Sequence, residues 1–443
     1  MTFLTSRVMR ISVASLLTGL LIGAVGGLFQ FFLFRMNRLR DALVLWAHNW
    51  PHIGWLAPIT LGFLGAAVAR IMVIRISPEA EGSGVQRGEA VFSGEVKPGG
   101  HTILPVKFFG GLIAMGSGLA LGREGPVVQM GASLAMLVSR FLLRHDEDVK
   151  AIDAAGAGAG LAVAFNAPIG GSIFVFEELT SSFTPWLLVA TLAAASCAVW
   201  TMRLILGNQL DFTVRQVGLT VVWRGWPFLL LGALLGAIGA LYNFTIIALL
   251  RVVDRMPGRS SVLRAGLIGA VIGLIAWFAP SLVGGGDNLT QGVLAGRYFM
   301  GSLAAIFVLR FVLGPLSYAA GTPGGLFAPM LVLGASFGGL FGEVLKHLFP
   351  DVHVTAIACA VVGMGTLFSA CVRAPLTGIV LAVEMTGRAG LTLALLGASL
   401  VAMVVAMLLR SEPIYETLKR RMLEQQAKAK ALSPAGRVTL QPT

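Results

Sequence analysis

The chain has 443 residues, of which 56% are hydrophobic and only 12% charged, and its mean hydropathy is +0.83. Soluble globular domains carry about a quarter charged residues, so this composition excludes an ordinary soluble protein. The net charge of +12 does not indicate a nucleic-acid partner, because the basic residues gather at the ends of apolar segments, as in cytoplasmic loops of membrane proteins.

Long apolar segments recur along the whole chain. They include Ser12–Phe34, Gly110–Leu121, Trp186–Trp200, Trp226–Leu250, Ala265–Phe278 and Leu391–Leu409. Several approach or exceed the ~20 residues that cross a ~30 Å hydrocarbon core. The first is too long for the apolar region of a cleaved signal peptide, and no small-residue cleavage site follows it. The sequence therefore predicts an all-α, polytopic protein embedded in a lipid bilayer.

Clusters of basic residues flank these segments. They are Arg7/Arg10, Arg35/Arg38/Arg40 and Lys419/Arg420/Arg421. Cytoplasmic loops carry an excess of lysine and arginine, and both ends of the chain are basic. We therefore expect both termini to lie in the cytoplasm.

Glycine and proline interrupt the apolar segments at four places. The clusters are GREGP (Gly122–Pro126), FNAP (Phe165–Pro168), GTPGGLFAP (Gly321–Pro329) and VRAP (Val372–Pro375). Helices that break at membrane depth are tolerated only where they are buried in protein or line a watery cavity. Many of the other glycines are expected to serve close helix packing.

The interrupted segments also repeat. GREGPVVQMGAS (Gly122–Ser133) aligns with GLFAPMLVLGAS (Gly325–Ser336), and NAPIGGSIFVFEE (Asn166–Glu178) aligns with RAPLTGIVLAVEM (Arg373–Met385). Both pairs keep their order at nearly equal offsets, which predicts two related transmembrane halves, 1–210 and 211–418, and a basic, disordered cytoplasmic tail, 419–443. Repeats with interrupted helices in matching positions indicate a transporter site near the bilayer midplane. Spacing alone leaves open whether the repeat is inverted.

Four segments could bind an anion without a full cation beside it. Helix N-termini offer free N–H groups and the positive end of the macrodipole, and glycine and proline suit such starts. Around Ser83, Glu81–Gly84 can form a nest of N–H groups with one hydroxyl. GREGP and GGLFAP supply helix starts from both halves, and Tyr415 can point its phenol inward from the end of the last apolar segment.

Two carboxylates are candidates for proton chemistry. Glu124 lies in a glycine-rich break at membrane depth, and its repeat partner is Phe327, so the scaffold does not need it. A local pair with Arg123 is the plainer alternative, but neighbouring residues on a helix point in different directions. Glu177 matches Glu384, which predicts a shared structural role such as bonding a buried backbone group. Glu178 matches Met385 and is the better proton acceptor.

Other classes of function find little support. The cysteines, Cys197, Cys359 and Cys371, lie in apolar runs without metal-ligand spacing and are expected to be packing residues. The sequence contains no HExxH motif, which would indicate an intramembrane metalloenzyme. It also contains no GxxxxGK[ST] motif, which would indicate an ATP-driven pump. We expect no enzymatic activity, no metal and no cofactor.

Taken together, the motifs resemble those of the chloride channel/transporter (CLC) family. The matching segments are GSGVQ (Gly82–Gln86), LGREGPVVQMG (Leu121–Gly131), AFNAPIGGSIFVFEE (Ala164–Glu178), GTPGGLFAPM (Gly321–Met330), RAPLTGIVLAVEMT (Arg373–Thr386) and EPIY (Glu412–Tyr415). They occur in the family's order and approximate spacing. The resemblance spans essentially Arg7 to Arg420, and it is closest to bacterial members without cytoplasmic CBS domains, which implies the bacterial inner membrane.

This resemblance implies two inverted halves, a homodimer with a pathway in each subunit, and exchange of chloride for protons. The implied anion-binding residues are Ser83, Gly84, Glu124, Gly125, Leu326, Phe327 and Tyr415. The hydroxyls of Ser83 and Tyr415 would contact the inner anion, and the N–H groups of Leu326 and Phe327 the central one. Glu124 would be the gate that swings out when protonated, and Glu178 the internal proton-transfer residue.

Two residues depart from the family pattern. Gln86 stands where proline is common, and Arg87 where many members have glutamate. Ser83 resembles the residue of chloride-preferring members, whereas proline there suggests nitrate and methionine the fluoride branch. A passive chloride channel of the same family is the alternative function, although a channel has no need of a proton acceptor at Glu178.

Overall fold

The computed structural model describes residues 2–208, 210–214, 225–256 and 260–432. These residues are almost entirely helical, and extended pairing among them is confined to two isolated bridges, Gly82–Pro323 and Gly122–Gly325. Nine of the described helices are long and apolar enough to cross a membrane. The predicted all-α, polytopic class is confirmed.

The helices of the first half are α1 (Thr2–Ala47), α2 (Leu56–Arg75), η1 (Pro78–Ala80), α3 (Val85–Phe92), α4 (Ile103–Pro105), η2 (Val106–Gly110), α5 (Gly111–Gly116), α6 (Glu124–Leu142), α7 (Asp146–Phe165), α8 (Pro168–Phe174), η3 (Val175–Leu179) and α9 (Pro185–Leu206). Those of the second half are α10 (Trp226–Asp254), α11 (Ser261–Phe278), η6 (Pro280–Leu282), α12 (Asp287–Leu294), α13 (Met300–Tyr318), α14 (Phe327–Leu348), α15 (Ala356–Val372), α16 (Pro375–Thr386), η7 (Ala389–Leu391), α17 (Thr392–Leu408) and α18 (Ile414–Leu432). Residues 215–224, which follow the predicted boundary between the halves, lie outside the described residues.

The glycine and proline clusters mark the starts of helices. The helices α6, α8, α14 and α16 begin at or within them, and α8 and α16 have proline in the first turn. The chain reaches α8 through Asn166 (φ 50°) and α16 through Arg373 (φ 66°), both left-handed. These two residues align in the predicted repeat, so both halves break their helices with the same backbone turn.

The two halves meet in opposite directions. Gly122 and Gly325, aligned in the repeat, exchange backbone hydrogen bonds of 2.8 and 2.7 Å in an antiparallel bridge, as an inverted repeat requires. The equivalence extends to α3 and α12, each eight residues long and each preceded by a left-handed glycine, Gly84 (φ 88°) or Gly286 (φ 100°). Sequence analysis missed this third pair because little besides two glycines and one valine matches.

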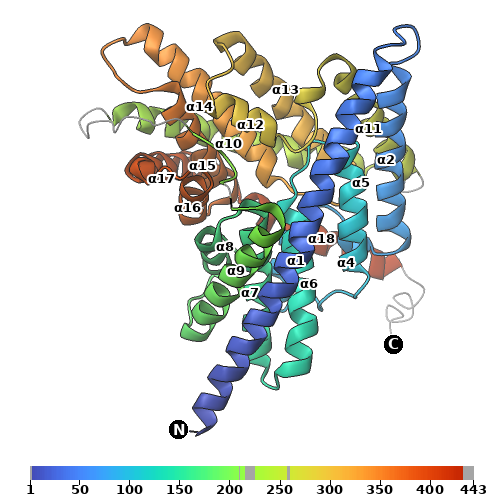
Figure 1. The fold of residues 1–443 in the computed structure, drawn as a ribbon, viewed down its shortest axis with the longest axis vertical. Helices are drawn as coiled ribbons and strands as arrows, with labels where there is room; N and C mark the ends of the chain where they lie inside the picture. The colour runs from blue at the N-terminus through green and yellow to red at the C-terminus, as the bar shows by residue number, and fades with distance from the viewer. Residues whose placement is uncertain (1, 209, 215–224, 257–259, 433–443) are drawn as a thin grey trace, which may run out of the picture.

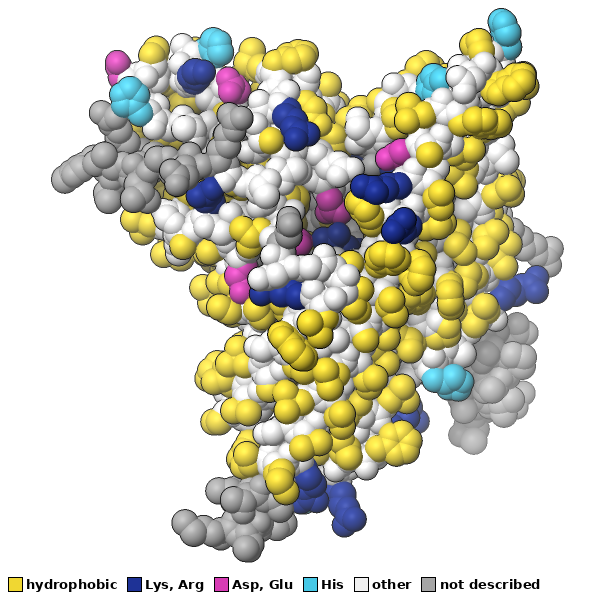
Figure 2. Space-filling view, viewed as in Figure 1, with side chains coloured by type: hydrophobic (Ala, Val, Ile, Leu, Met, Phe, Trp, Pro, Cys, Tyr) yellow, Lys and Arg dark blue, Asp and Glu magenta, His cyan; other side chains and the backbone are white. Residues whose placement is uncertain are grey.

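Helices from different halves also pack side by side. In Figure 1, α2 and α11 lie together at one edge of the molecule. Their backbones touch, because a Cβ added at Gly62 would lie only 2.1 Å from the carbonyl oxygen of Gly269. This is the small-residue packing expected of membrane helices. Figure 2 shows hydrophobic side chains over most of the visible face, with charged side chains in a hollow near its centre.

The first helix contradicts the expectation that every basic cluster marks the cytoplasmic side of the membrane. Because α1 is continuous from Thr2 to Ala47, Arg7 and Arg35 are separated by 28 helical residues, roughly 42 Å along the axis. The two clusters lie toward opposite ends of the helix (Figure 1), so they cannot both mark the cytoplasmic side. The guanidinium groups of Arg35 and Arg38 instead stack on the rings of Phe31 and Phe34.

The tail also differs from expectation. Residues 419–432, predicted to be disordered, continue α18 as a helix, whereas 433–443 lie outside the described residues. Ion pairs fasten this helix to the rest of the chain. Arg421 binds Asp254 of α10 at 2.6 Å, and Lys419 lies 3.4 Å from Glu95. The hydrophilic composition suggested a disordered tail. Residues 419–432 are helical because they contact residues that lie far away in the sequence.

Candidate functional site

Four helices begin close together at the centre of the molecule. The segment before α3 pairs with the segment before α14, since Gly82 N–H donates to the Thr322 carbonyl at 3.2 Å and Gly324 N–H to the Gly82 carbonyl at 3.0 Å. The Gly122–Gly325 bridge ties α6 to the same place. Tyr415, in the first turn of α18, packs its ring 5.7 Å from that of Phe327. The first N–H groups of a helix have no intrahelical partner, so donors gather here.

Three polar side chains at this centre are fully buried and incompletely bonded. Ser83, Glu124 and Tyr415 are all 0% exposed. The Ser83 hydroxyl, the Tyr415 hydroxyl and Glu124 Oε1 have no hydrogen-bond partner among the described residues. Glu124 Oε2 accepts one bond, from the Ala328 N–H of α14 at 3.4 Å. Buried polar groups are rarely left unpaired, so this set indicates room for a polar ligand.

Glycines bring the polar backbone segments into contact here. A Cβ at Gly125 would lie 2.6 Å from both the carbonyl and the hydroxyl oxygen of Ser83. One at Gly122 would lie 1.9 Å from Glu124 Oε2. Only glycine allows backbone this close to another chain segment or to a ligand. The GREGP motif is therefore a close-approach motif as well as a helix start.

The start of α14 forms the apolar wall of the site. Leu326 and Phe327 are fully buried, and their N–H groups stand just before that of Ala328, which bonds Glu124. The Phe327 ring lies 4.8 Å from that of Phe368 and 5.7 Å from that of Phe174. These rings keep the dielectric low around the free N–H groups, which strengthens their interaction with a negative charge.

A buried lysine, which the sequence analysis missed, forms hydrogen bonds with the backbone of the Ser83 loop. Lys107, in η2 and 0% exposed, donates to the carbonyl oxygens of Gly82 at 2.7 Å and Ser83 at 3.2 Å. Both carbonyls of the loop therefore have a buried cationic donor. The signal was present, because Lys107 is an isolated charged residue in an apolar stretch, where such residues are functional candidates.

Arg123 does not pair with its neighbour Glu124. Its guanidinium donates to the Ala164 carbonyl at 2.9 Å and to Asp211 at 3.1 Å, and it lies 3.4 Å from Asp287 of the second half. Arg123, Asp211 and Asp287 line a cavity of about 230 Å³. Burial raises the pKa of Asp211 to about 6, against the opposing effect of Arg123. Sequence analysis missed both aspartates.

The face of the molecule opposite the Arg123 cavity carries both described ends of the chain. It also has a larger cavity, of about 810 Å³. Arg7 near the N-terminus and Lys419 of α18 both line it, so the two ends lie on one face. The helix α7 connects the faces, because its Asp148 pairs with Arg7 and Arg123 bonds Ala164 at its far end. Glu178 also lines this cavity, and we call this side the terminal face.

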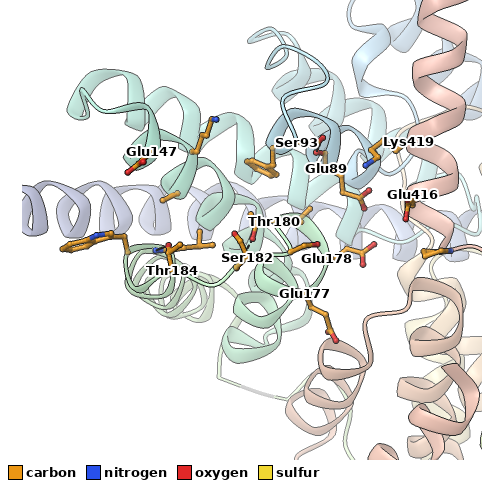
Figure 3. Close-up of a pocket in the computed structure, with 18 of the residues that line it drawn as sticks. Glu89, Ser93, Glu147, Glu177, Glu178, Thr180, Ser182, Thr184, Glu416 and Lys419 are labelled. Carbon is orange, nitrogen blue, oxygen red and sulfur yellow. Dashed lines mark hydrogen bonds between the residues drawn. The ribbon is translucent and has the colours of Figure 1, made fainter. Parts of the chain in front are cut away.

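Glu178 lies in an acidic group on the terminal face. In Figure 3 the side chains of Glu89 and Glu178 point into the same space, with Glu416 and Lys419 opposite them on α18. Burial raises the pKa of Glu178 well above its ordinary value, and the neighbouring Glu89 raises it further. Burial likewise raises the pKa of Glu89 to about 7. Both carboxyls therefore favour the protonated form more than an exposed glutamate does.

Glu177 points away from that group (Figure 3) and binds the second half. Its oxygens accept the N–H groups of Leu376 at 3.0 Å and Thr377 at 2.7 Å, at the start of α16. Glu384 does the same for Ile169 and Gly170 at the start of α8, at 3.2 and 2.7 Å. The predicted structural role of the Glu177–Glu384 pair is confirmed, and it takes the form of reciprocal helix caps.

The predicted site residues thus fall into two places. Seven of them surround the unpaired atoms at the centre: Ser83, Gly84, Glu124, Gly125, Leu326, Phe327 and Tyr415. Glu178 lies apart, on the terminal face.

The known proteins whose sequences resemble this chain are chloride channels and H(+)/Cl(-) exchange transporters. A family described as "Voltage gated chloride channel" matches residues 65–407. The chain is 39% identical over 423 residues to the H(+)/Cl(-) exchange transporter ClcA of Vibrio cholerae (strain M66-2), covering 93% of this chain and 89% of that one. It is 37% identical over 431 residues to the H(+)/Cl(-) exchange transporter ClcA of Cronobacter sakazakii, covering 96% and 92%.

A solved structure shows the same fold. The X-ray crystal structure of a slow cyanobacterial Cl-/H+ antiporter superposes with a TM-score of 0.91 at 32% identity, covering 94% of this chain and 99% of that one. A eukaryotic CLC transporter superposes with a TM-score of 0.82 at 22% identity, which supports the fold alone.

Proposed function

The chain belongs to the CLC family, and we propose that it exchanges chloride for protons across the membrane through the central site of Ser83, Glu124 and Tyr415. One observation carries the proposal: two hydroxyls and a carboxylate oxygen are fully buried where helices begin, and they have no hydrogen-bond partner within the described part of the chain. A chloride ion would satisfy both hydroxyls and the nearby N–H groups.

The anion is held by partial charges. The hydroxyls of Ser83 and Tyr415, with the N–H of Gly84, bind the inner anion, and the N–H groups of Leu326 and Phe327 bind the central one. The start of α6, including Gly125, offers donors to an outer anion. Partial charges attract chloride without the tight binding that a facing ammonium or guanidinium group would produce.

Glu124 couples the anion to the proton by competition. Its ionised carboxylate is itself an anion, and its Oε2 already accepts an N–H of α14. Protonation makes the Glu124 carboxyl a weaker acceptor for those N–H groups, and chloride then binds them in place of the carboxylate. Glu178 supplies or accepts the proton from the terminal face, where it shares a cavity with Glu89 and Glu416.

We further propose that the terminal face is cytoplasmic, in the bacterial inner membrane. Arg7 and Lys419 both line the same cavity there, which supports placing both termini on the positive-inside side. Membership in the family supports a homodimer with a separate pathway in each subunit.

Proton movement driven by a chloride gradient tests the exchange. Purified protein in liposomes is given a chloride gradient, and external pH is recorded. The wild type is expected to move protons uphill. Glu124→Ala is expected to keep anion flux and lose proton movement, because no carboxylate competes with chloride. A mutant that still drives protons uphill would contradict the assignment of Glu124.

Glu178→Gln is expected to lose proton transport and retain anion transport, since the amide takes up no proton near neutral pH. Glu424→Gln, on the exposed side of α18, is the matched control and is expected to behave as wild type. Wild-type protein that conducts chloride without any proton movement would instead identify a passive channel.

A further inference from the structure

Arg123 immediately precedes the proposed gate, Glu124, but its guanidinium binds groups on three other segments. It donates to the Ala164 carbonyl at the end of α7 at 2.9 Å. It also pairs with Asp211, after α9, at 3.1 Å and lies 3.4 Å from Asp287 at the start of α12. The exchange mechanism proposed above gives the two aspartates no part.

The segment that carries Asp211 is fixed by helices of the second half. The Phe212 N–H donates to the Met385 carbonyl of α16 at 3.1 Å. Thr213 exchanges two hydrogen bonds, each of 2.9 Å, with the side-chain amide of Gln291 in α12. The Asp211 side chain is only 16% exposed. Its carboxylate is therefore held in one place and largely shielded from water.

A buried arginine likewise fixes the loop that precedes Asp287. Arg310 of α13, 1% exposed, donates to the carbonyl oxygens of Gly284 and Gly285, each at 2.7 Å. Lys107 makes the equivalent contacts in the first half. The inverted repeat thus supplies one buried cation to the loop on each face, and the Asp287 carboxylate projects from a supported backbone.

The other charged groups around this cluster have partners of their own. Arg203 of α9 donates to Asn166 Oδ1 at 2.9 Å, and Arg40 of α1 pairs with Asp41 at 2.8 Å. Within the described ranges of the chain, the two aspartates are the carboxylates within ion-pair distance of the Arg123 guanidinium. They are therefore the groups that decide where this guanidinium lies.

A guanidinium without these partners would disturb the exchange in two ways. A full cation facing the chloride path binds the anion more tightly than partial charges do. It would also attract the ionised carboxylate of Glu124, the next residue in the chain. An opposite charge nearby favours the ionised form of a carboxyl. The gate would then need a higher proton concentration to open.

We infer that Asp211 and Asp287 are positioning residues for the exchange, which hold the Arg123 guanidinium away from Glu124 and from the chloride path. Neither aspartate contacts the transported ions, and both act through Arg123. This inference rests on the proposed function, because it assumes that protonation of Glu124 opens the path.

Chloride-driven proton flux in liposomes, measured as a function of pH, tests the inference. Exchange becomes faster as the pH falls, because the gate must be protonated. Asp211→Asn keeps the shape of the side chain and removes its charge. The pH of half-maximal exchange is expected to fall by about one unit, the lower end of the effect of a nearby opposite charge on a carboxyl. Asp211→Glu keeps the charge and is expected to keep the wild-type pH dependence.

Asp287→Asn is expected to shift the half-maximal pH in the same direction by a smaller amount. Its side chain is 48% exposed, and solvent weakens an ion pair of that kind. Asp351→Asn is the control, because it removes an exposed carboxylate that has no part in these contacts. It is expected to leave the pH dependence unchanged. Melting temperatures in detergent show that each variant is folded.

A double mutant shows whether the aspartates act through Arg123. In an Arg123→Gln background, Asp211→Asn is expected to cause no further shift, because the cation that it would release is gone. A shift that persists in this background, or an unchanged half-maximal pH in both asparagine variants, would overturn the inference. A wild type that moves no protons at any pH would instead refute the proposed function, so the two failures are distinguishable.

Discussion

At the residue scale, the glutamates differ in whether their carboxylate oxygens have hydrogen-bond partners. Glu177 and Glu384 are both satisfied by N–H groups of the opposite half. Glu124 and Glu89 each keep one oxygen that has no hydrogen-bond partner in the described ranges of the chain. A buried carboxylate that lacks hydrogen-bond donors lowers the stability of the folded protein. Such groups occur mainly at functional sites, where a carboxyl gains and loses a proton. This distinction separates the structural glutamates from those available for protons.

The raised pKa of Glu89 leads to a prediction for stability. Burial lifts this pKa from about 4.3 to about 7, so the charged form is disfavoured in the folded state. Folded protein then binds more protons than unfolded protein between these values, and stability is expected to fall as pH rises through about 7. Glu89→Gln removes the charge and is expected to stabilise the protein at pH 8.

The expected gain is on the order of 2 kcal/mol at pH 8, less than the full shift implies because glutamine also gives up the attraction of Lys419. At pH 5 the two proteins should differ little. Thermal unfolding in detergent at both pH values measures the difference. An equal effect of the mutation at pH 5 and pH 8 would show that the charge of Glu89 is not its cause.

Sequence reasoning located residues with a local signal. Ser83 and Glu124 stand inside glycine-rich motifs, and Glu178 differs from its partner in the repeat. It missed groups that come together only in the fold. Tyr318 contacts Ser83 across 235 residues, and Arg123 meets Asp211 across 88. No periodicity or motif in one chain encodes such pairs, because each member looks ordinary in its own segment.

At the element scale, glycine sets how closely helices approach. In α14, a Cβ at Gly334 would lie 2.2 Å from the carbonyl oxygen of Gly363 in α15. The backbone there cannot give way without moving the helix that begins at the central site. Sequence analysis anticipated close packing at such glycines, but not which helices would meet.

Gly334→Ala is therefore expected to destabilise the protein by about 3 kcal/mol, as overpacking of a tight interface does. Gly100→Ala is the control, because the nearest atom to its Cβ would be 3.6 Å away. Melting temperatures in detergent compare the two. A Gly334→Ala protein as stable as the control would mean that α14 and α15 can separate freely.

The sequence also predicted where the elements break, because glycine and proline fix backbone geometry locally. It did not predict how far α18 extends. Its hydrophilic composition resembles that of a free tail, and the partners that order it, Asp254 and Glu95, lie more than 150 residues earlier.

At the scale of the whole molecule, the reciprocal caps make the two halves depend equally on each other. Glu177 satisfies the start of α16, and Glu384 satisfies the start of α8. Removing either carboxylate leaves two N–H groups without their acceptor. Glu177→Ala and Glu384→Ala are expected to destabilise the protein by similar amounts, about 2 kcal/mol each. Thermal unfolding of the two variants provides the comparison, and a loss confined to one of them would contradict the equivalence.

The shared terminal face predicts the topology. Fusions of green fluorescent protein to either end are expected to fluoresce in bacteria, and fusions of a periplasmic phosphatase to either end to be inactive. Fluorescence from only one of the two fusions would place the termini on opposite sides. Internal repetition made two halves predictable from the sequence, and the basic ends predicted that both termini lie on one side of the membrane. The cavity that Arg7 and Lys419 both line supports that second prediction.

The backbone exchange between Gly82 and the Thr322–Gly324 segment has a consequence for biosynthesis. A ribosome must add some 240 residues after Ser83 before the first of these partners exists, and Tyr415 emerges later still. A nascent chain halted after its first half has donors for a halide but no walls to enclose it. We therefore expect the central site to close only when synthesis of the chain is nearly complete.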